Sequence, residues 1–464
     1  MHILIFSDQH VESLGGAQTS ILLQRKYLQR AGHLVTVCQP RSFKPGVVNR
    51  SRQGVGSDAA HAGDNVQAAA RGGSALAASS AVTELNTPAI PVTPDREYSL
   101  TLPTGLVQRW LDRHTEKLPP IDLVLVQADF AQALIGYRFA RRHRLPVVHT
   151  THTNIGESFR SNTGRIAPLL LRGFLLLQRH RLGGRRSRLK DPEFAIYDEY
   201  ARRAAAVVTP SLHFQELLRK AGVSTGYAAA EFVHAITGVD DDLVDPVAAA
   251  GGAADATVPA GAAVRRDPTR IVWSGRMSPE KRLLPFIEAL RLLATGGAEF
   301  NAEIYGEGAE KDAAITAVKA AGLDDRVRFC GRVSYPEMLA AQRHSGVLAQ
   351  TSIGFETQGM TVYESLTLGT VVAVSDPNIY AEVASAADTA DFLVAVADRT
   401  PQSLARALRQ ALQLARAASI GGGEAGAAGE GGSAPAPHRQ FLQSTQTAKL
   451  LDVYSRVLRV TGRR

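Results

Sequence analysis

Short apolar runs alternate with amphipathic stretches along most of this chain. Residues 2–6, 33–40, 121–127 and 146–152 are almost continuously apolar, as expected for parallel strands that are buried on both faces. The stretch 17–30 between the first two runs carries apolar residues at helical spacing. This order of strand, helix and strand is typical of a doubly wound α/β sheet.

The same alternation returns in the second half of the chain. The pattern therefore predicts two Rossmann-like α/β domains, at residues 1–240 and 269–440. Strands of the second domain are expected at the start of 270–282 and within 302–308, 327–333 and 346–352.

Three stretches consist largely of Ala, Gly, Ser and Pro and lack the apolar side chains that a core needs. We expect a disordered insertion at about 50–82, a flexible linker at 241–268 and a low-complexity linker at about 420–438. A final helix is expected over 441–464, with its apolar residues on one face: Leu450, Tyr454, Val457 and Leu458.

The cysteine content and the character of the first residues indicate the cellular compartment in which the protein is expected. The chain has two cysteines, Cys38 and Cys330, far apart in sequence, so no disulfide framework is implied and a reducing compartment fits. The first residues lack the basic and long apolar regions of a signal peptide, and no stretch approaches the roughly 18 apolar residues of a membrane span. We therefore expect a cytoplasmic protein.

The net charge of +8 is concentrated in one place, the basic segment Arg160–Lys190, which has nine Arg and Lys residues and no acid. Arg165, Arg172 and Arg179 recur every seven residues, so they line one face of a helix. The apolar residues of the opposite face are Ile166, Leu170, Phe174 and Leu177. Such a helix suits the headgroup layer of an anionic membrane, at its inner face. The alternative is an ordinary domain helix with a solvated basic face; nucleic acid is disfavoured because interleaved aromatic residues are nearly absent.

Two features of the first domain suit ligand binding. Gly15 and Gly16 follow the first strand and precede a helix, where glycine lets the backbone approach a ligand closely. His152 comes at the carboxyl end of a strand, where ligands bind in open α/β sheets. His149 lies an odd number of residues away and is expected on the other face of the strand.

The second domain carries two clusters of polar residues. Glu356 and Glu364 are separated by seven residues, and between them Gly359, Met360 and Thr361 mark the expected start of a helix. The N–H groups of a helix start bind anions, and carboxylates accept hydrogen bonds from sugar hydroxyls. Upstream, a strand leads to Gly275 and Arg276, and Lys281 follows near the start of a helix expected from about Pro279, an arrangement that clamps a diphosphate.

These motifs resemble those of retaining glycosyltransferases of family 4, which have the GT-B fold. The Glu356-x7-Glu364 spacing is similar to the family's signature. The sequence ETQGMTVYES at residues 356–365 is most similar to the branch that glycosylates membrane lipids, such as diacylglycerol glycosyltransferases and phosphatidylinositol mannosyltransferases. Gly275-Arg276 with Lys281 resembles the family's Gly-Arg-(x)4-Lys motif. Further resemblances are Gly15-Gly16-Ala17-Gln18, His152 in HTTHTN, and Thr237–Asp240 at the domain crossover.

The resemblance implies transfer of a hexose from a UDP- or GDP-sugar with retention, needing no metal or cofactor. It assigns the diphosphate to Arg276, Lys281, Gly15, Gly16, Gly275 and the amides at Gly359, Met360 and Thr361. Glu364 would hold the ribose, while Glu356 and His152 would orient the transferred sugar. The Gly331–Tyr335 loop, with Val333 in it, would hold the base, and the 441–464 helix would cross back onto the first domain. The resemblance also implies a glycolipid or diacylglycerol-type lipid as the acceptor.

Alternatives remain open. The same fold could act on a soluble acceptor, or as a sugar-nucleotide epimerase, which would release an epimerised sugar without an acceptor. A non-catalytic membrane-surface protein is disfavoured because it would not need both glutamates with Arg276 and Lys281. A nicotinamide dehydrogenase is disfavoured because no G-x-G-x-x-G follows the first strand.

Overall fold

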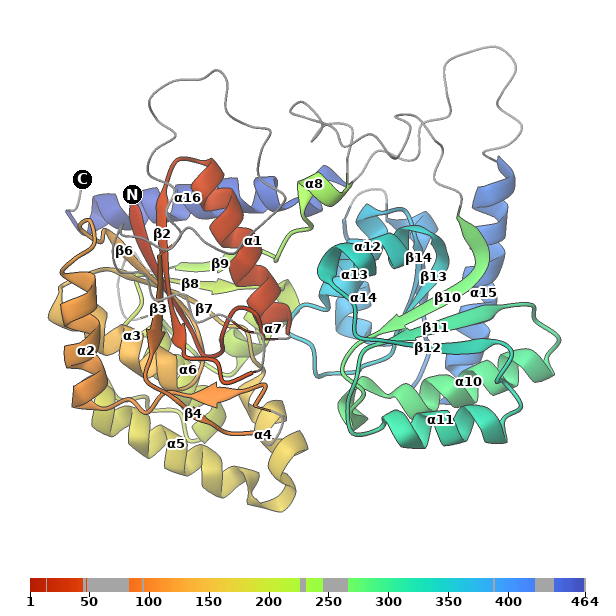
Figure 1. Cartoon of the computed structure of the whole chain (residues 1–464), viewed down its shortest axis with the longest axis horizontal. Helices are drawn as coiled ribbons and strands as arrows, with labels where there is room; N and C mark the ends of the chain where they lie inside the picture. The colour runs from red at the N-terminus through yellow and green to blue at the C-terminus, as the bar shows by residue number, and fades with distance from the viewer. Residues whose placement is uncertain are drawn as a thin grey trace, which may run out of the picture.

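The computed structural model describes residues 1–13, 15–44, 47, 83–93, 96–225, 231–244, 266–386, 389–421 and 438–462. These residues form two α/β domains, each built on a parallel sheet with helices on both faces (Figure 1). The predicted pair of doubly wound domains is confirmed. The insertion expected at 50–82, and most of the linkers expected at 241–268 and 420–438, lie outside the described residues.

The first sheet has the strand order β3-β2-β1-β6-β7-β8-β9. Its strands are β1 (His2–Ser7), β2 (Leu34–Pro40), β3 (Thr83–Thr87), β6 (Leu123–Gln127), β7 (Val147–Thr150), β8 (Ala206–Thr209) and β9 (Glu231–His234). The helices are α1 (Gly16–Arg30), α2 (Gly105–Thr115), α3 (Ala131–Arg142), α4 (Ile155–Thr163), α5 (Ala167–Leu182), α6 (Pro192–Ala201) and α7 (Leu212–Lys220). A short antiparallel pair, β4 (Ile90–Pro91) and β5 (Ser99–Leu100), and a 3-10 turn, η1 (Gly164–Ile166), complete it.

Alternating side chains of the central strand β1 enter two different cores, which explains its unbroken apolar sequence. Leu4 and Phe6 pack with α3 and α5, whereas Ile3 and Ile5 pack with α1 and the last helix of the chain. A strand covered on both faces has no position for a polar side chain in its middle.

The second sheet has the order β12-β11-β10-β13-β14-β15. Its strands are β10 (Asp267–Ser274), β11 (Asn301–Tyr305), β12 (Val327–Gly331), β13 (Ser345–Gln350), β14 (Val371–Val374) and β15 (Leu393–Ala395). The remaining elements are α8 (Asp241–Val244), η2 (Pro279–Lys281), α10 (Leu283–Thr295), α11 (Lys311–Ala320), α12 (Tyr335–Arg343), α13 (Met360–Thr367), α14 (Pro377–Ala384), η3 (Ala390–Phe392), α15 (Pro401–Gly421), η4 (Arg439–Phe441) and α16 (Gln443–Val460).

One element begins later than the sequence predicts. The helix expected from about Pro279 begins at Leu283, and Pro279–Lys281 forms a separate 3-10 turn. Arg282 separates the two because its φ of 57° is left-handed, which a continuous α-helix excludes. Lys281 therefore lies on a tight turn.

The chain crosses between the domains twice, and the two crossings are bonded to each other. The N–H of Val239 donates to the Phe441 carbonyl, and the N–H of Gln443 donates to the Val239 carbonyl, each at 2.8 Å. A Cβ on Gly238 would lie 2.6 Å from Gln443 Cα, so this contact requires glycine.

Beyond this crossing, α16 runs along the first domain (Figure 1). The residues of its buried face are Leu450, Val453, Tyr454 and Val457. Val453 takes the place expected for Leu458, which is half-buried, because positions i, i+3, i+4 and i+7 share a helix face.

Candidate active site

The start of α13 is open to an anion. Gly359 precedes it with a φ of 79°, and a Cβ there would lie 2.8 Å from Ile379 Cδ1, so the sharp turn after Gln358 needs glycine. The cap residue Gly359 has no side chain that could accept from the first N–H groups of the helix. The N–H groups at Met360 and Thr361 also have no intrahelical partner, as in the first turn of any helix. Free N–H groups at the positive end of the helix dipole are an anion site.

Lys281 and Glu356 meet in front of this helix start. The Lys281 ammonium donates to Glu356 Oε1, and the Ser352 hydroxyl donates to the same oxygen at 2.7 Å. Burial opposes ionisation of Glu356, but the charge and hydrogen bond of Lys281 outweigh it, so the pKa of Glu356 is lowered. The site therefore holds a charged pair at neutral pH.

The turn that carries Lys281 is fixed from the sheet. Trp273 Nε1 donates to Thr351 Oγ1 at 2.8 Å, and Thr351 Oγ1 donates to the Lys281 carbonyl at 2.5 Å. Arg276, at the end of β10, is half-exposed and its nearest described acid is Glu280, at 3.6 Å. Arg276 therefore lies near the pair with its guanidinium largely uncommitted.

Close backbone packing supports this turn. A Cβ on Gly306, whose φ is +125°, would lie 1.9 Å from the Gly275 carbonyl oxygen. At Gly275 itself an added Cβ would make only ordinary contacts, the nearest at 3.5 Å. Glycine at position 306 is thus the residue that lets the ends of β10 and β11 approach.

Glu364 has a different environment from Glu356. It lies in the second turn of α13, is 5% exposed, and accepts a hydrogen bond from Gln342 Nε2 at 3.2 Å. Burial without a cation raises the pKa of Glu364 to about 7. Val333 packs into the apolar cluster that contains Val362 of α13, so the Gly331–Tyr335 loop lies beside this helix.

The glycine loop of the first domain faces the helix start of the second. A Cβ on Gly16 would lie 3.1 Å from Met360 Sδ, and Gly15 turns the chain with a φ of 155°. The two segments singled out in the sequence therefore meet between the domains.

His152 also lies at the domain boundary. Thr357 Oγ1 donates to the His152 carbonyl oxygen at 3.0 Å, which joins the Glu356 turn to the loop after β7. Asp129 accepts from the backbone N–H groups of His152 and Thr153, at 3.1 and 2.8 Å. Burial lowers the pKa of the His152 imidazole to about 4, so it is neutral at physiological pH.

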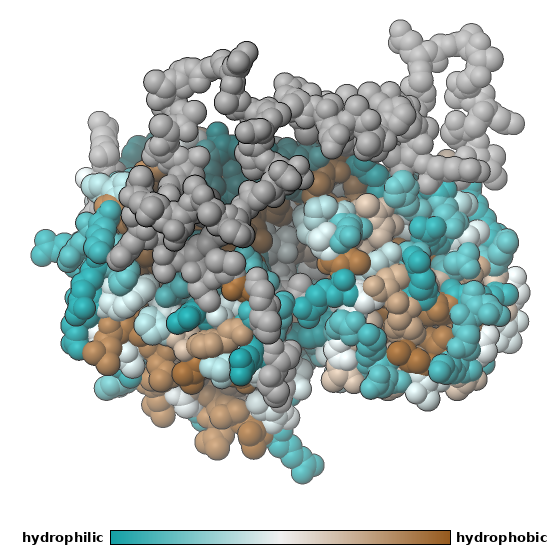
Figure 2. Space-filling model, in the orientation of Figure 1, coloured by the Kyte–Doolittle hydropathy of each residue, from teal (hydrophilic) through white to brown (hydrophobic). Residues whose placement is uncertain are grey.

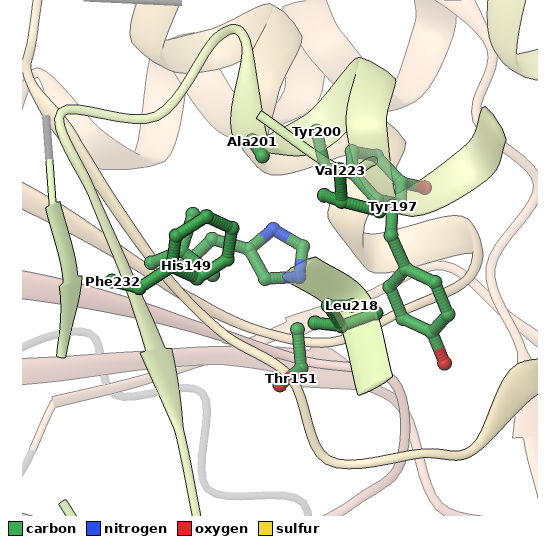
Figure 3. A pocket seen from close by; sticks show the side chains of 9 residues that line it. His149, Thr151, Tyr197, Tyr200, Ala201, Leu218, Val223 and Phe232 are labelled. Atoms are coloured by element: carbon green, nitrogen blue, oxygen red, sulfur yellow. The ribbon is translucent and has the colours of Figure 1, made fainter. Parts of the chain in front are cut away.

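His149 lies on the other face of the strand, as expected. Its imidazole lines a cavity of about 10 Å³. Figure 3 shows Tyr200, Leu218 and Phe232 around the same cavity. His149 Nδ1 is 2.9 Å from the Tyr137 hydroxyl. A cavity of this size holds no sugar, so His149 supports the core beneath the His152 loop.

The structure brings Lys281, Glu356, Met360, Gly16 and His152 to one boundary between the domains. Glu364 lies further along α13, Val333 lies in the loop beside that helix, and Arg276 is half-exposed.

Further hydrogen bonds hold this boundary together, and among the residues that make them Asp129 was not predicted from the sequence. Ser211 Oγ donates to the Thr357 carbonyl, and Gln358 exchanges hydrogen bonds of 2.8 and 2.9 Å with the backbone of Thr237. Asp129 could have been found, because it closely follows a strand as His152 does. Ser211 was predicted as a helix cap and Thr357 as a residue of the donor site, but their contacts across the boundary could not be predicted, since these depend on how the domains dock.

Two protein families match the chain. Residues 14–226 match Glycosyltransferase Family 4, and residues 259–419 match Glycosyl transferases group 1. Among curated proteins, a GDP-mannose-dependent alpha-(1-6)-phosphatidylinositol dimannoside mannosyltransferase of Mycobacterium tuberculosis is 33% identical over 144 residues. That match spans 31% of this chain and about a third (35%) of the relative's length.

Solved structures share the fold along the whole chain. A sucrose-phosphate synthase of Thermosynechococcus elongatus has a TM-score of 0.61 and 14% identity, covering 99% of both chains. HepE of Anabaena, in complex with UDP-glucose, has a TM-score of 0.56 and 15% identity, covering 98% of this chain and 99% of its own. The pneumococcal O-GlcNAc transferase GtfA, with UDP and GlcNAc, has a TM-score of 0.60 and 11% identity, covering 99% of both chains.

Proposed function

We propose that this chain, which carries a Glycosyltransferase Family 4 domain followed by a Glycosyl transferases group 1 domain, transfers a hexose from a UDP- or GDP-sugar to a lipid acceptor with retention of anomeric configuration. The observation that carries the proposal is the meeting of Lys281, Glu356 and the open start of α13 with Gly16 and His152 of the other domain. Cations and free amides suit a diphosphate, and a carboxylate and an imidazole suit sugar hydroxyls.

In the proposed reaction, Lys281, Arg276 and the amides of α13 bind the diphosphate. The bond from the anomeric carbon to the diphosphate oxygen breaks, and the acceptor hydroxyl oxygen bonds to the same face of that carbon. The hydroxyl proton passes to the departing diphosphate. Negative charge grows on the leaving group, where the two cations stabilise it, so no metal ion is required.

The glutamates and His152 recognise the rest of the donor. Glu364 accepts hydrogen bonds from the ribose hydroxyls, and the loop around Val333 contacts the base. Glu356 is released from Lys281 when the ammonium turns to the diphosphate, and it then binds the transferred sugar together with His152. The bound UDP-glucose in HepE supports a nucleotide-sugar donor here.

The surface of α5 supports a lipid acceptor. Leu171, Leu175 and Leu182 face the core, whereas Leu169 and Leu176 are 70% and 64% exposed. Figure 2 shows an apolar patch at the lower edge of the first domain, where Figure 1 places α5. A helix that packs by one face and leaves a second apolar face uncovered suits the membrane interface. The name of the Mycobacterium relative, which acts on a phosphatidylinositol dimannoside, points the same way.

The basic residues expected on one helix face are arranged differently in the structure. Arg165 lies in the turn η1 and Arg172 on α5, and both are exposed, but Arg179 of α5 donates to the buried Glu199 at 2.7 Å. Within the described ranges no helix is long and apolar enough to cross a bilayer. We therefore propose contact with an anionic membrane surface through Arg165, Arg172 and the exposed leucines.

The test is a panel of UDP- and GDP-sugars offered with diacylglycerol, glycolipid and phosphoinositide acceptors in vesicles, with and without EDTA. We expect one donor and one lipid to give product. The NMR coupling constants of the product should show the anomeric configuration of the donor, and EDTA should not lower the activity.

Lys281→Met should lower kcat/KM by about 10²–10³, the typical cost of one transition-state contact. Lys311→Met, which removes a half-buried lysine paired with Glu307, is the matched control. Product on a soluble acceptor alone, an inverted product, or an epimerised sugar without an acceptor would overturn the proposal.

A further inference from the structure

The His152 imidazole ends a chain of hydrogen bonds that runs through the first domain. Its Nε2 lies 3.0 Å from Gln127 Oε1, at the end of β6. Gln127 Nε2 donates to Gln24 Oε1 of α1, and Gln24 Nε2 donates to the Tyr454 hydroxyl at 3.0 Å. Tyr454 belongs to α16, so the chain links the sugar-side histidine to the last helix.

This relay, Gln127–Gln24–Tyr454, is buried and uncharged. The three side chains are at most 5% exposed. Hydrogen bonds in such surroundings are strengthened by the low dielectric, and an unpaired amide there is costly. An adjoining cavity of about 20 Å³, lined in part by Ser20, Thr237 and Gln443, matches the volume and polarity that one water molecule requires.

The structure gives the relay a direction: Gln24 Nε2 donates to the Tyr454 hydroxyl and Gln127 Nε2 donates to Gln24 Oε1, and each amide accepts only through its oxygen. Since Gln127 Nε2 is used on Gln24, its Oε1 faces the imidazole and accepts. The proton of neutral His152 then lies on Nε2, and Nδ1 is left as the acceptor of the ring.

The backbone of His152 is held separately. Asp129 accepts from its N–H, and its carbonyl accepts from Thr357. These bonds fix where the residue lies but do not choose between the two tautomers of its side chain.

We propose that Gln127, Gln24 and Tyr454 are positioning residues that hold His152 as the Nε2–H tautomer and so present Nδ1 to a hydroxyl of the transferred sugar. The inference rests on the proposed function for its consequence, but the tautomer itself does not depend on activity. It gives α16 a role in the sugar site, since the helix supplies the terminal acceptor of the relay.

The tautomer can be read from long-range ¹H–¹⁵N spectra of the full chain, with the His152 signals assigned by their loss in His152→Asn. Wild type should show neutral Nε2–H imidazole. Tyr454→Phe, which removes one oxygen and keeps the shape, should give a mixture of tautomers. Gln108→Met is the matched control: Gln108 is equally buried but donates to the Ile135 carbonyl.

A second variant changes charge rather than connectivity. Gln127→Glu places a carboxylate against the imidazole and should raise the His152 pKa from about 4 into the observable range. Asp129 and His149, the other titratable groups near His152, are unchanged by this substitution. An Nδ1–H tautomer in wild type, or an unchanged tautomer in Tyr454→Phe, would overturn the proposal.

Kinetics then separates the relay from the proposed function. Tyr454→Phe should lower kcat by roughly two- to tenfold, the worth of one neutral hydrogen bond. The same comparison can be made with a series of donors that each lack one sugar hydroxyl. For one of these donors Tyr454→Phe should leave kcat unchanged, because that donor lacks the hydroxyl whose hydrogen bond Nδ1 accepts. Equal sensitivity of all donors would overturn the relay's role toward sugar. Absence of any transfer with the expected tautomer intact would count against the proposed function alone.

Discussion

Glu356 and Glu364 are the same residue type, eight positions apart, and they differ in the partner that each one faces. Lys281 faces Glu356 and lowers its pKa, whereas Glu364 faces the amide of Gln342 and burial raises its pKa to about 7. An ammonium compensates a buried carboxylate far better than an amide does. The first glutamate is therefore ionised throughout the physiological range, and the second titrates within it.

This difference predicts a pH-dependent donor affinity. The ribose hydroxyls need the ionised form of Glu364, so binding should tighten as pH rises and Glu364 loses its proton. Below pH 7 the dissociation constant of a nucleotide sugar should fall about tenfold for each unit by which the pH rises, and above pH 7 it should stay constant. Isothermal titration between pH 5.5 and 8.5 measures it, with an intact nucleotide sugar so that the diphosphate charge stays constant.

Glu364→Gln provides the comparison for that experiment. The amide cannot ionise, so the variant should bind more weakly at pH 8 and show no slope below pH 7. A slope that survives the substitution would assign the titration to another group.

Among the elements, α5 offers the sharpest test of the membrane surface. Replacing Arg165 and Arg172 together by Glu reverses two exposed charges and should weaken binding to anionic vesicles at least tenfold, since each basic residue near such a surface is worth about 1 kcal/mol. Sedimentation with vesicles measures the change. Arg179 is unsuitable, because its loss would leave buried Glu199 without a cation.

Arg291→Glu, a reversal on α10 of the other domain, serves as the control and should bind vesicles as wild type does. Equal binding by all three proteins would remove α5 from the membrane proposal.

The glycine turn after β11 makes a second prediction at this scale. Gly306→Ala would push a Cβ into the Gly275 carbonyl oxygen at 1.9 Å, at a φ of +125°. We expect a loss of about 2–4 kcal/mol in the free energy of unfolding, because the ends of two strands must separate. Denaturant unfolding of the second domain measures it.

Gly297→Ala isolates the backbone contribution to that loss. Its φ is also positive, at 74°, but a Cβ there meets nothing within 4 Å. It should cost only about 1 kcal/mol. Similar losses for both variants would contradict the steric explanation.

For the whole molecule, the contact between α7 and α14 holds the two domains together beside the donor site. His213 Nδ1 lies 2.8 Å from Glu382 Oε2, and His234 of β9 lies 3.3 Å from the other oxygen, to which Tyr363 also donates. Burial works against a charged His213, but its hydrogen bond to Glu382 and the charge of that carboxylate outweigh it, so the pKa of His213 is raised. The ion pair needs the protonated form of His213. Closure of the domains should therefore be strongest below the ordinary histidine pKa of about 6.5, and it should weaken as the pH rises through the raised pKa of His213.

Small-angle scattering can follow this opening as a rise in radius of gyration between pH 6 and 8.5. Glu382→Gln keeps the shape but removes the charge, and it should be more open at pH 6 and insensitive to pH. A wild-type radius that stays constant over this range would refute the electrostatic account.

The fold could be predicted because its signals are local. Unbroken apolar runs mark strands covered on both faces, and strand, glycine turn and helix already place Gly16 and Met360 at the carboxyl edges of their sheets. The helix start near Pro279 was predicted too early, because the left-handed backbone of Arg282 interrupts the helix and leaves no mark in the pattern of apolar and polar residues. The bonds from Thr357 to His152 and from His213 to Glu382 join residues more than a hundred positions apart, and only the docking of the domains determines them.

The reciprocal amide bonds between Val239 and the segment around Phe441 restrict how the two lobes can move. Two chain segments that are hydrogen-bonded to each other where they cross between the domains cannot slide or separate independently. Each lobe can therefore only rotate about that crossing. Opening must then be angular: the parts of the domain boundary far from this crossing separate most, and the backbone next to Gly238 hardly shifts. A substrate would enter from the side farthest from this pivot.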